Sequence, residues 1–155
     1  MTLAEGDMIP DCTLTAADGS ALALRSLIGA PLVLYFYPKD DTPGCTREAQ
    51  DFSAHAADFA AFGAKVVGVS KDEPAKHRKF AAKYDLKVAL ATDADGGVLE
   101  AFGTWVEKSM YGKKYMGIER STFLFSADGR LARAWPKVKV PGHADDVLAA
   151  VRALA

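Results

Sequence analysis

The stretch LVLYFYPKDDTPGCTRE, residues 32–48, indicates the fold because it joins a buried strand to the start of a helix. The six apolar residues 32–37 are typical of a strand that is covered on both faces. Thr42 has the character of a helix N-cap, and Pro43 suits the first helical position. Cys45 is therefore expected in the first helical turn, where backbone N–H groups and the helix dipole favour an anion. The anion that a cysteine supplies is a thiolate, so the sequence predicts a reactive nucleophile.

The residues after Cys45 predict further alternation of helices and strands. Small or apolar residues follow at steps of four and three positions and define one helical face: Ala49, Phe52, Ala56 and Phe59. Gly63 ends this helix, and residues 65–70 indicate a second central strand. Further along, the patterns predict a helix at 74–84, a strand near 88–91 and a helix near 97–102. A hairpin at 121–126 and 130–135 and a last helix from 144 onward complete the chain.

The order of elements predicts an α/β fold. Residues 12–15 and 21–24 form an N-terminal β-hairpin, and strand–helix–strand units follow it. This pattern implies a central mixed β-sheet flanked by helices on both faces, and it resembles a thioredoxin-like fold with an N-terminal hairpin extension. The 155 residues contain no repeat or linker-like stretch, so a single domain spanning 1–155 is expected.

Composition argues against several classes of partner. The formal net charge is −1 and the lysines are spread along the chain, so we expect neither a nucleic-acid partner nor an anionic membrane surface. No apolar segment approaches the length of a membrane span, and the first ten residues do not form a secretory signal. Two cysteines do not make a disulfide scaffold, which favours a reducing, cytoplasmic location.

The stretch P-x-x-x-T-P-G-C, residues 38–45, resembles the active-site signature of peroxiredoxins. The run FYPKDDTPGCT is most similar to the bacterioferritin-comigratory, or PrxQ, branch of that family. The resemblance also covers MYGKKYMGIERSTFLF at 110–125 and WPKVKVPGHADDVLAA at 135–150, and so nearly the whole chain. It implies a thiol-dependent peroxidase that reduces hydrogen peroxide and organic hydroperoxides without a cofactor.

The resemblance assigns roles to four residues. Cys45 matches the peroxidatic cysteine, whose thiolate attacks one peroxide oxygen. Arg120 matches the family's arginine, which stabilises the thiolate and then the charge that develops on the two oxygens. Thr42 would orient the peroxide through its hydroxyl, and Pro38 would shield the thiolate from water.

Two further residues are candidates for supporting roles. The backbone N–H of Gly44 would donate to the bound anion, and Glu48, about one turn after Cys45, would hold Arg120. Ordinary structural roles compete with these assignments. Cys45 could be a buried small apolar residue, Thr42 only a helix cap and Arg120 a surface ion-pair partner.

The chain departs from many of its relatives in the second, resolving cysteine. Gln50 occupies the position where many relatives carry it, and the helix at 74–84, where others place it, contains no cysteine. Cys12 remains as a weak candidate and is expected to be a core residue. The prediction is a one-cysteine mechanism in which peroxide converts Cys45 to a sulfenic acid and an external thiol reduces it. The family implies thioredoxin, glutaredoxin or glutathione as reductant and a monomeric protein.

Three other functions compete with this prediction. A thioredoxin-type disulfide exchanger would need Cys-x-x-Cys, but Glu48 stands three residues after Cys45. A glutathione-peroxidase-like enzyme would share the fold but has a different cysteine context. A redox-sensing binding module or holdase without turnover also stays open, and catalytic turnover with added thiol would distinguish it from an enzyme.

Metal catalysis is not expected. The three histidines, His55, His77 and His143, are widely separated and match no ligand motif, and no nucleotide-binding fingerprint is present. His55 and His77 fall on polar faces of their predicted helices and are expected to be solvated, whereas His143 is expected to be structural.

Overall fold

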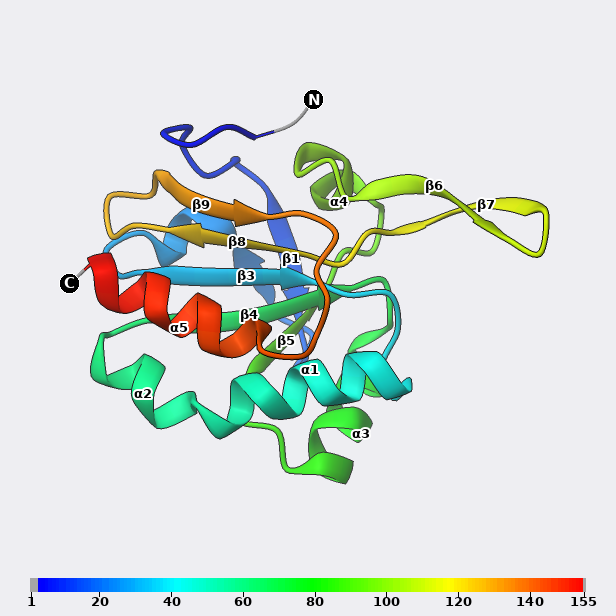
Figure 1. Ribbon diagram of the computed structural model, residues 1–155, viewed down its shortest axis with the longest axis horizontal. Helices are drawn as coiled ribbons and strands as arrows, with labels where there is room; N and C mark the ends of the chain where they lie inside the picture. Colours follow the sequence, from blue (N-terminus) through cyan, green and yellow to red (C-terminus); the bar gives the residue numbers. More distant parts are fainter. Residues whose placement is uncertain (1–2, 155) are drawn as a thin grey trace.

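A seven-stranded β-sheet forms the centre of the computed structural model, which describes residues 3–154 (Figure 1). In chain order the strands are β1 (Thr13–Ala16), β2 (Ala21–Ala23), β3 (Leu32–Phe36), β4 (Lys65–Ser70), β5 (Ala89–Thr92), β6 (Trp105–Met110), β7 (Lys113–Ile118), β8 (Ser121–Phe125) and β9 (Leu131–Trp135). The helices are η1 (Leu24–Leu27, a 3-10 helix), α1 (Pro43–Ala54), α2 (Ala56–Ala61), α3 (Pro74–Tyr84), α4 (Gly97–Ala101) and α5 (His143–Leu154).

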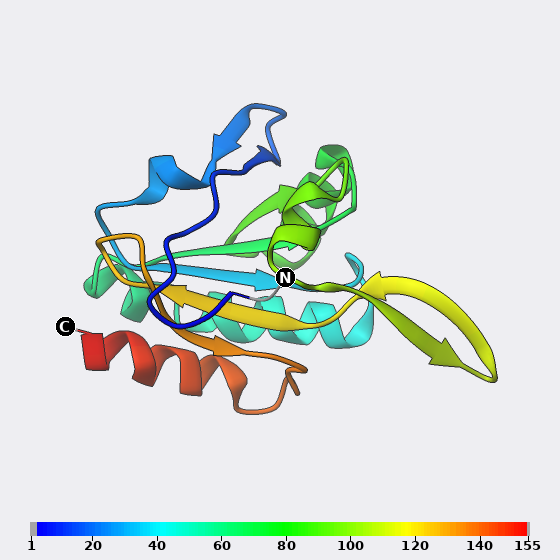
Figure 2. The same ribbon diagram turned by 90° about the horizontal axis from the view of Figure 1, so that it is seen from above.

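The sheet is mixed, as the sequence predicted. Its strand order is β2-β1-β5-β4-β3-β8-β9, with β3, β4 and β5 parallel to one another and the other pairs antiparallel. Figure 2 shows α1 and α5 on one side of this sheet and the N-terminal segment on the other. The predicted α/β architecture with a thioredoxin-like core and an N-terminal hairpin is confirmed.

β3 is the central strand and is buried on both faces. Its side chains alternate between two apolar clusters, as a period of two residues requires. Val33 and Tyr35 join the cluster that α1, α2, α3 and α5 cover, whereas Leu32, Leu34 and Phe36 join the cluster that contains α4 and η1. These five side chains are at most 2% exposed, so the apolar run at 32–37 is explained by its position between two helical layers.

The helix predicted through Cys45 and Phe59 is interrupted at His55. The backbone leaves helical geometry there (φ −100°, ψ 11°), and α1 and α2 meet at this residue. The N–H of His55 still donates to the carbonyls of Phe52 and Ser53, so the break is a local change of direction. Phe52 and Phe59 accordingly remain in the same apolar cluster, and their rings lie 6.0 Å apart.

The sequence patterns missed the hairpin of β6 and β7, which forms a separate two-stranded sheet. This ribbon projects from the body of the molecule (Figures 1 and 2). Most of its side chains are exposed or half-buried, so neither strand shows the apolar alternation that identifies a strand packed on a core. Its turn places Tyr111 and Gly112 at positive φ (52° and 79°), a conformation in which tyrosine is uncommon.

No helix among residues 3–154 has the length and apolar character needed to cross a membrane.

Gly68 on β4 provides a test of how tightly β3 packs. It pairs with Tyr35, and a Cβ atom at Gly68 would lie 2.5 Å from Cζ of the Tyr35 ring. That ring is stacked on Phe52 with centroids 4.7 Å apart, so it has little freedom to move. We predict that Gly68→Ala lowers the free energy of unfolding by about 1–3 kcal/mol, measured by urea denaturation. Unchanged stability would show that the ring moves aside at little cost.

Candidate active site

Cys45 lies at the N-terminal end of α1, as the sequence predicted. The backbone of Thr42 is extended at the N-cap position, Pro43 begins the helix, and Cys45 is its third residue. The side chain of Cys45 is 2% exposed and belongs to the cluster that contains Tyr35 and Ala49. A thiol placed here lies beside the positive end of a twelve-residue helix.

Backbone donors surround the same position. The first intrahelical hydrogen bond of α1 runs from the N–H of Thr46 to the carbonyl of Thr42 (2.8 Å). The N–H groups of Gly44 and Cys45 precede this bond and belong to the set of amides that a helix leaves without intrahelical acceptors. They are available to an anion at the helix start.

Arg120 reaches Cys45 from a distant part of the chain. It stands between β7 and β8, and its Nη2 donates to Sγ of Cys45 at 3.3 Å. Its Nη1 donates to Oε1 of Glu48 at 2.7 Å, so one guanidinium bridges the thiol and the carboxylate. Gly44 leaves room for this arrangement, because a Cβ there would lie 3.3 Å from Nη2. The structure thus joins four of the residues that the sequence singled out.

Burial makes the ionisation of Glu48 unusual. The side chain is 2% exposed, and desolvation raises its pKa to about 7 although the charge of Arg120 lowers it. Within the described part of the chain, Oε2 of Glu48 has no hydrogen-bond partner. For Arg120, burial lowers the pKa, but the charges of Glu48 and Cys45 outweigh this effect and hold it above its usual value. The guanidinium therefore stays charged while Glu48 titrates near neutrality.

Thr42 occupies the N-cap position without making the side-chain bond of an N-cap. Its hydroxyl donates to the carbonyl of Lys39 (2.8 Å) and not to an amide of α1, so the expected capping role is wrong in this respect. Because its proton is directed at Lys39, the lone pairs of the hydroxyl oxygen remain able to accept a hydrogen bond. Pro38 lies in the same loop, exposed to solvent and directly after the buried Tyr37.

The two cysteines lie on different sides of the sheet. Cys45 belongs to the cluster under α1 and α5, whereas Cys12 is half-buried against the opposite cluster. Both are free thiols, and burial followed by the charge of Asp93 raises the pKa of Cys12. A disulfide needs Cα atoms within about 7 Å, a condition that the intervening sheet opposes. Gln50 is exposed on α1.

One of the three histidines lies in an environment that the sequence did not predict. His77 is buried and touches Asp40, so the prediction that it is solvated was wrong. His55 is partly exposed and pairs with Asp145. His143 is buried beside Thr122, and desolvation lowers its pKa to about 4, so it is neutral near pH 7. Residues 3–154 contain no group of three or more His, Cys, Asp or Glu side chains placed to hold a metal.

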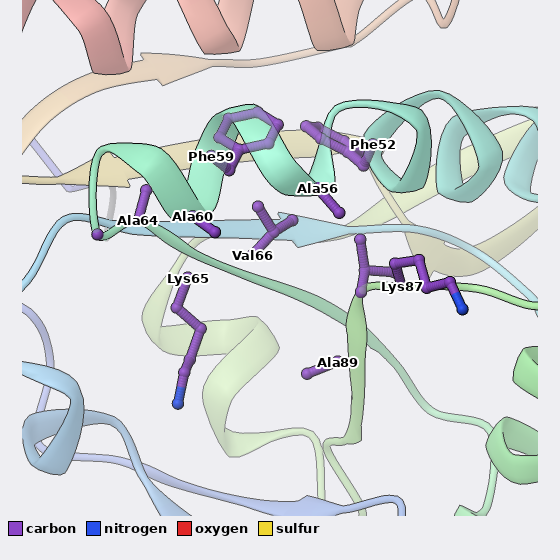
Figure 3. Close-up of a pocket in the computed structure, with 11 residues that line it drawn as sticks. Phe52, Ala56, Phe59, Ala60, Ala64, Lys65, Val66, Lys87 and Ala89 are labelled. Carbon is purple, nitrogen blue, oxygen red and sulfur yellow. The ribbon is translucent and has the colours of Figure 1, made fainter.

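An apolar hollow of about 450 Å³ lies apart from these residues (Figure 3). Its walls come from the end of α1, from α2 and from the first residues of β4 and β5, including Phe52, Phe59 and Val66. Lys65 and Lys87 are its titratable residues, and it includes none of the side chains around Cys45. The hollow is therefore separate from the site around Cys45 and contains no thiol.

Comparison with known proteins agrees with this geometry. The model of the AhpC/TSA family matches residues 6–134. Peroxiredoxin Bcp of Xanthomonas campestris is 50% identical over 143 residues, which make up 92% of this chain and 89% of that protein. A cysteine-to-serine variant of X. campestris peroxiredoxin Q superposes with a TM-score of 0.91 at 46% identity, over 98% of this chain and 100% of its own.

A second solved structure from X. campestris is also similar to this chain. The structure of X. campestris bacterioferritin comigratory protein, from work on its alkyl peroxide reduction activity, has a TM-score of 0.88 at 47% identity and covers 95% of this chain and 98% of its own. The chain therefore belongs to the AhpC/TSA family, a class of thiol-dependent peroxidases with a thioredoxin-like fold. Within that class it is a peroxiredoxin of the Bcp, or PrxQ, type.

The raised pKa of Glu48 predicts a pH dependence of stability. The folded state keeps this proton up to about pH 7, whereas the unfolded state loses it near the ordinary glutamate value of about 4.3. The contribution of Glu48 to the free energy of unfolding is therefore fully present below its pKa in the unfolded state. It is lost as the pH rises through the folded-state pKa of about 7, by up to about 3 kcal/mol.

The Glu48→Gln variant tests this prediction because it has no proton to lose. Urea unfolding of the reduced protein between pH 5 and pH 8 should give a free energy that falls less steeply for Glu48→Gln than for the parent. The slope is the informative quantity, since loss of the contact with Arg120 shifts the whole curve. Parallel curves would show that Glu48 ionises normally.

Proposed function

We propose that Cys45 is the peroxidatic residue of this thiol-dependent peroxidase. Its thiolate sulfur attacks the terminal oxygen of a hydroperoxide, the O–O bond breaks, and a hydroxyl group is transferred to sulfur. The other oxygen leaves as alkoxide or hydroxide and takes a proton from the medium, which yields an alcohol or water and Cys45 sulfenic acid. Organic hydroperoxides and hydrogen peroxide are the proposed substrates, the former supported by the alkyl peroxide reduction activity of the X. campestris relative.

The contact between Arg120 and Cys45 is the observation that carries this proposal. At 3.3 Å from Sγ, Nη2 stabilises the thiolate before reaction and lies close to the oxygens on which charge develops. Glu48 fixes the guanidinium plane from its other nitrogen. Arg120 thereby stabilises negative charge in the transition state, while Glu48 acts as its positioning residue.

Thr42 and the helix amides complete the proposed peroxide site. The hydroxyl oxygen of Thr42 can accept a hydrogen bond from the O–H of the substrate, because its own proton is donated to the backbone carbonyl of Lys39. The amides of Gly44 and Cys45 donate to the peroxide oxygens, so acceptor and donors together fix the direction of the O–O bond. We assign to Pro38 the shielding of the thiolate from bulk water.

We further propose a one-cysteine cycle. The sulfenic acid condenses with an external thiol to a mixed disulfide and water, and a second thiol releases Cys45 as the oxidised reductant forms. The position of Cys12 across the sheet and the exposed Gln50 support this route. The reductant is thioredoxin, glutaredoxin or glutathione, acting on a monomer that works as a single domain in the cytoplasm.

Removal of Arg120 should slow the first oxidation. We predict that Arg120→Ala lowers the second-order rate of Cys45 oxidation by hydrogen peroxide about 100-fold or more, since one such donor contributes several kcal/mol to the barrier. Rapid quench and thiol quantification give this rate. Arg47→Ala is the matched control, because Arg47 is an exposed arginine two residues from Cys45 that pairs with Asp51. A rate for Arg120→Ala equal to the control would remove Arg120 from the reaction.

Intact mass after near-stoichiometric peroxide tests the one-cysteine cycle. The reduced protein should gain oxygen, Cys45→Ser should gain none, and Cys12→Ser should behave as the parent and turn over with added thiol. A loss of two hydrogens in the parent, absent in Cys12→Ser, would identify Cys12 as a resolving cysteine. Consumption of one equivalent without turnover would instead indicate a sensor.

A further inference from the structure

A largely buried polar cluster contacts the loop that carries the proposed peroxide site. This cluster, here called the loop anchor, consists of Tyr37, Asp40, Asp72 and His77. Asp40 belongs to the loop between β3 and α1, Asp72 follows β4, and His77 lies on α3. The loop anchor therefore connects the active-site loop to two other elements of the fold.

The carboxylate of Asp40 is the centre of the loop anchor. Its side chain is fully buried, as is that of His77, whose Nδ1 lies 2.7 Å from Oδ2. The hydroxyl of Tyr37 donates to Oδ1 at 2.5 Å. Burial raises the pKa of Tyr37 far above its usual value, so this hydroxyl keeps its proton and remains a donor.

The backbone of Asp40 is held as firmly as its side chain. Its N–H donates to Oδ2 of Asp72 at 2.8 Å, and the same oxygen accepts the hydroxyl of Ser70. Burial raises the pKa of Asp72, but these bonds and the contact with Lys76 outweigh it and hold the pKa below its usual value. Asp72 is therefore an ionised acceptor under neutral conditions.

The loop anchor stabilises the fold less well than ordinary apolar core packing would. The contact of Nδ1 of His77 with Oδ2 of Asp40 is close but is not an aligned hydrogen bond, and among residues 3–154 neither this oxygen nor Nε2 of His77 has a hydrogen-bond partner. A buried polar group without a partner is destabilising, and apolar residues of similar volume often stabilise a fold as well or better. The polar contacts of the loop anchor hold the loop in a defined position, which apolar packing would not do.

One peptide group links the loop anchor to the proposed peroxide site. The carbonyl of Lys39, which accepts the Thr42 hydroxyl, belongs to the same peptide group as the N–H of Asp40. Asp72 fixes that peptide from its nitrogen side, and Tyr37 and His77 fix the Asp40 side chain. The orientation of the Thr42 hydroxyl therefore depends on the loop anchor.

We propose that Asp40 and His77 are positioning residues for peroxide reduction, which hold the Lys39 carbonyl and hence the Thr42 hydroxyl in the orientation that receives the hydroperoxide. This inference rests on the proposed role of Cys45. It assigns a role in the reaction to His77, which lies on α3 and contacts Asp40.

Two reactions of Cys45 separate positioning from general loosening. Oxidation by peroxide uses Thr42, whereas alkylation by iodoacetamide needs the thiolate but no oriented hydroxyl. In a Cys12→Ser background, where Cys45 is the single thiol, we expect His77→Phe to lower the ratio of the peroxide rate to the alkylation rate about 10- to 100-fold. Tyr37→Phe, which removes one donor with little change of shape, should lower the ratio in the same direction.

Matched variants make the test decisive. His77→Asn keeps a nitrogen close to the place of Nδ1 and should restore much of the ratio, and His55→Phe alters a partly exposed histidine and should leave it unchanged. An unchanged ratio in His77→Phe, or in Tyr37→Phe should His77→Phe not fold, overturns the proposal while the proposed function stands. If the parent itself is not oxidised at Cys45, the proposed function fails and the role of the loop anchor fails with it.

Discussion

Burial of β3 on both faces is the constraint on which the active site depends. Because apolar layers cover both faces of β3, its chain stays extended until it leaves these layers, and it turns only after Tyr37. The loop that follows then delivers the first turn of α1 at the carboxyl end of the strand, where ligands of open α/β sheets commonly bind. The place of Cys45 follows from the length of β3 and from the start of α1 at Pro43.

The same strand brings Arg120 to the thiol. β8 runs antiparallel to β3, and Phe36 at the end of β3 faces Ser121 at the start of β8. Arg120 therefore stands one residue beyond the paired region, at the edge of the sheet from which α1 begins. Two segments that lie 75 residues apart are joined by this register and by the hydrogen bond from Nη2 to Sγ.

Polar groups around the site depart from the rule that buried groups are fully paired. Glu48, His77 and Tyr35 each keep a buried polar atom without a partner among residues 3–154. Such departures are destabilising and cluster where a protein holds reactive groups in a defined geometry. Glu48 contacts Arg120, and His77 contacts Asp40 in the loop before α1. The unpaired atoms of Glu48 and His77 therefore both lie near this loop and the start of α1.

The sequence by itself determined the central strand, the helix start at Pro43 and the place of Cys45 in the first turn of that helix, because apolar runs and helix termini are local properties. The tertiary structure decided what depends on distant partners. His77 falls on the polar side of α3 by periodicity, yet the loop of Asp40 covers it. Thr42 bonds to Lys39 because the loop curves back, and the β6–β7 ribbon lacks the core contact that would mark its strands. The separation of Cys12 from Cys45 likewise depends on which face of the sheet each one meets, since that relation is set by strand pairing across the whole chain.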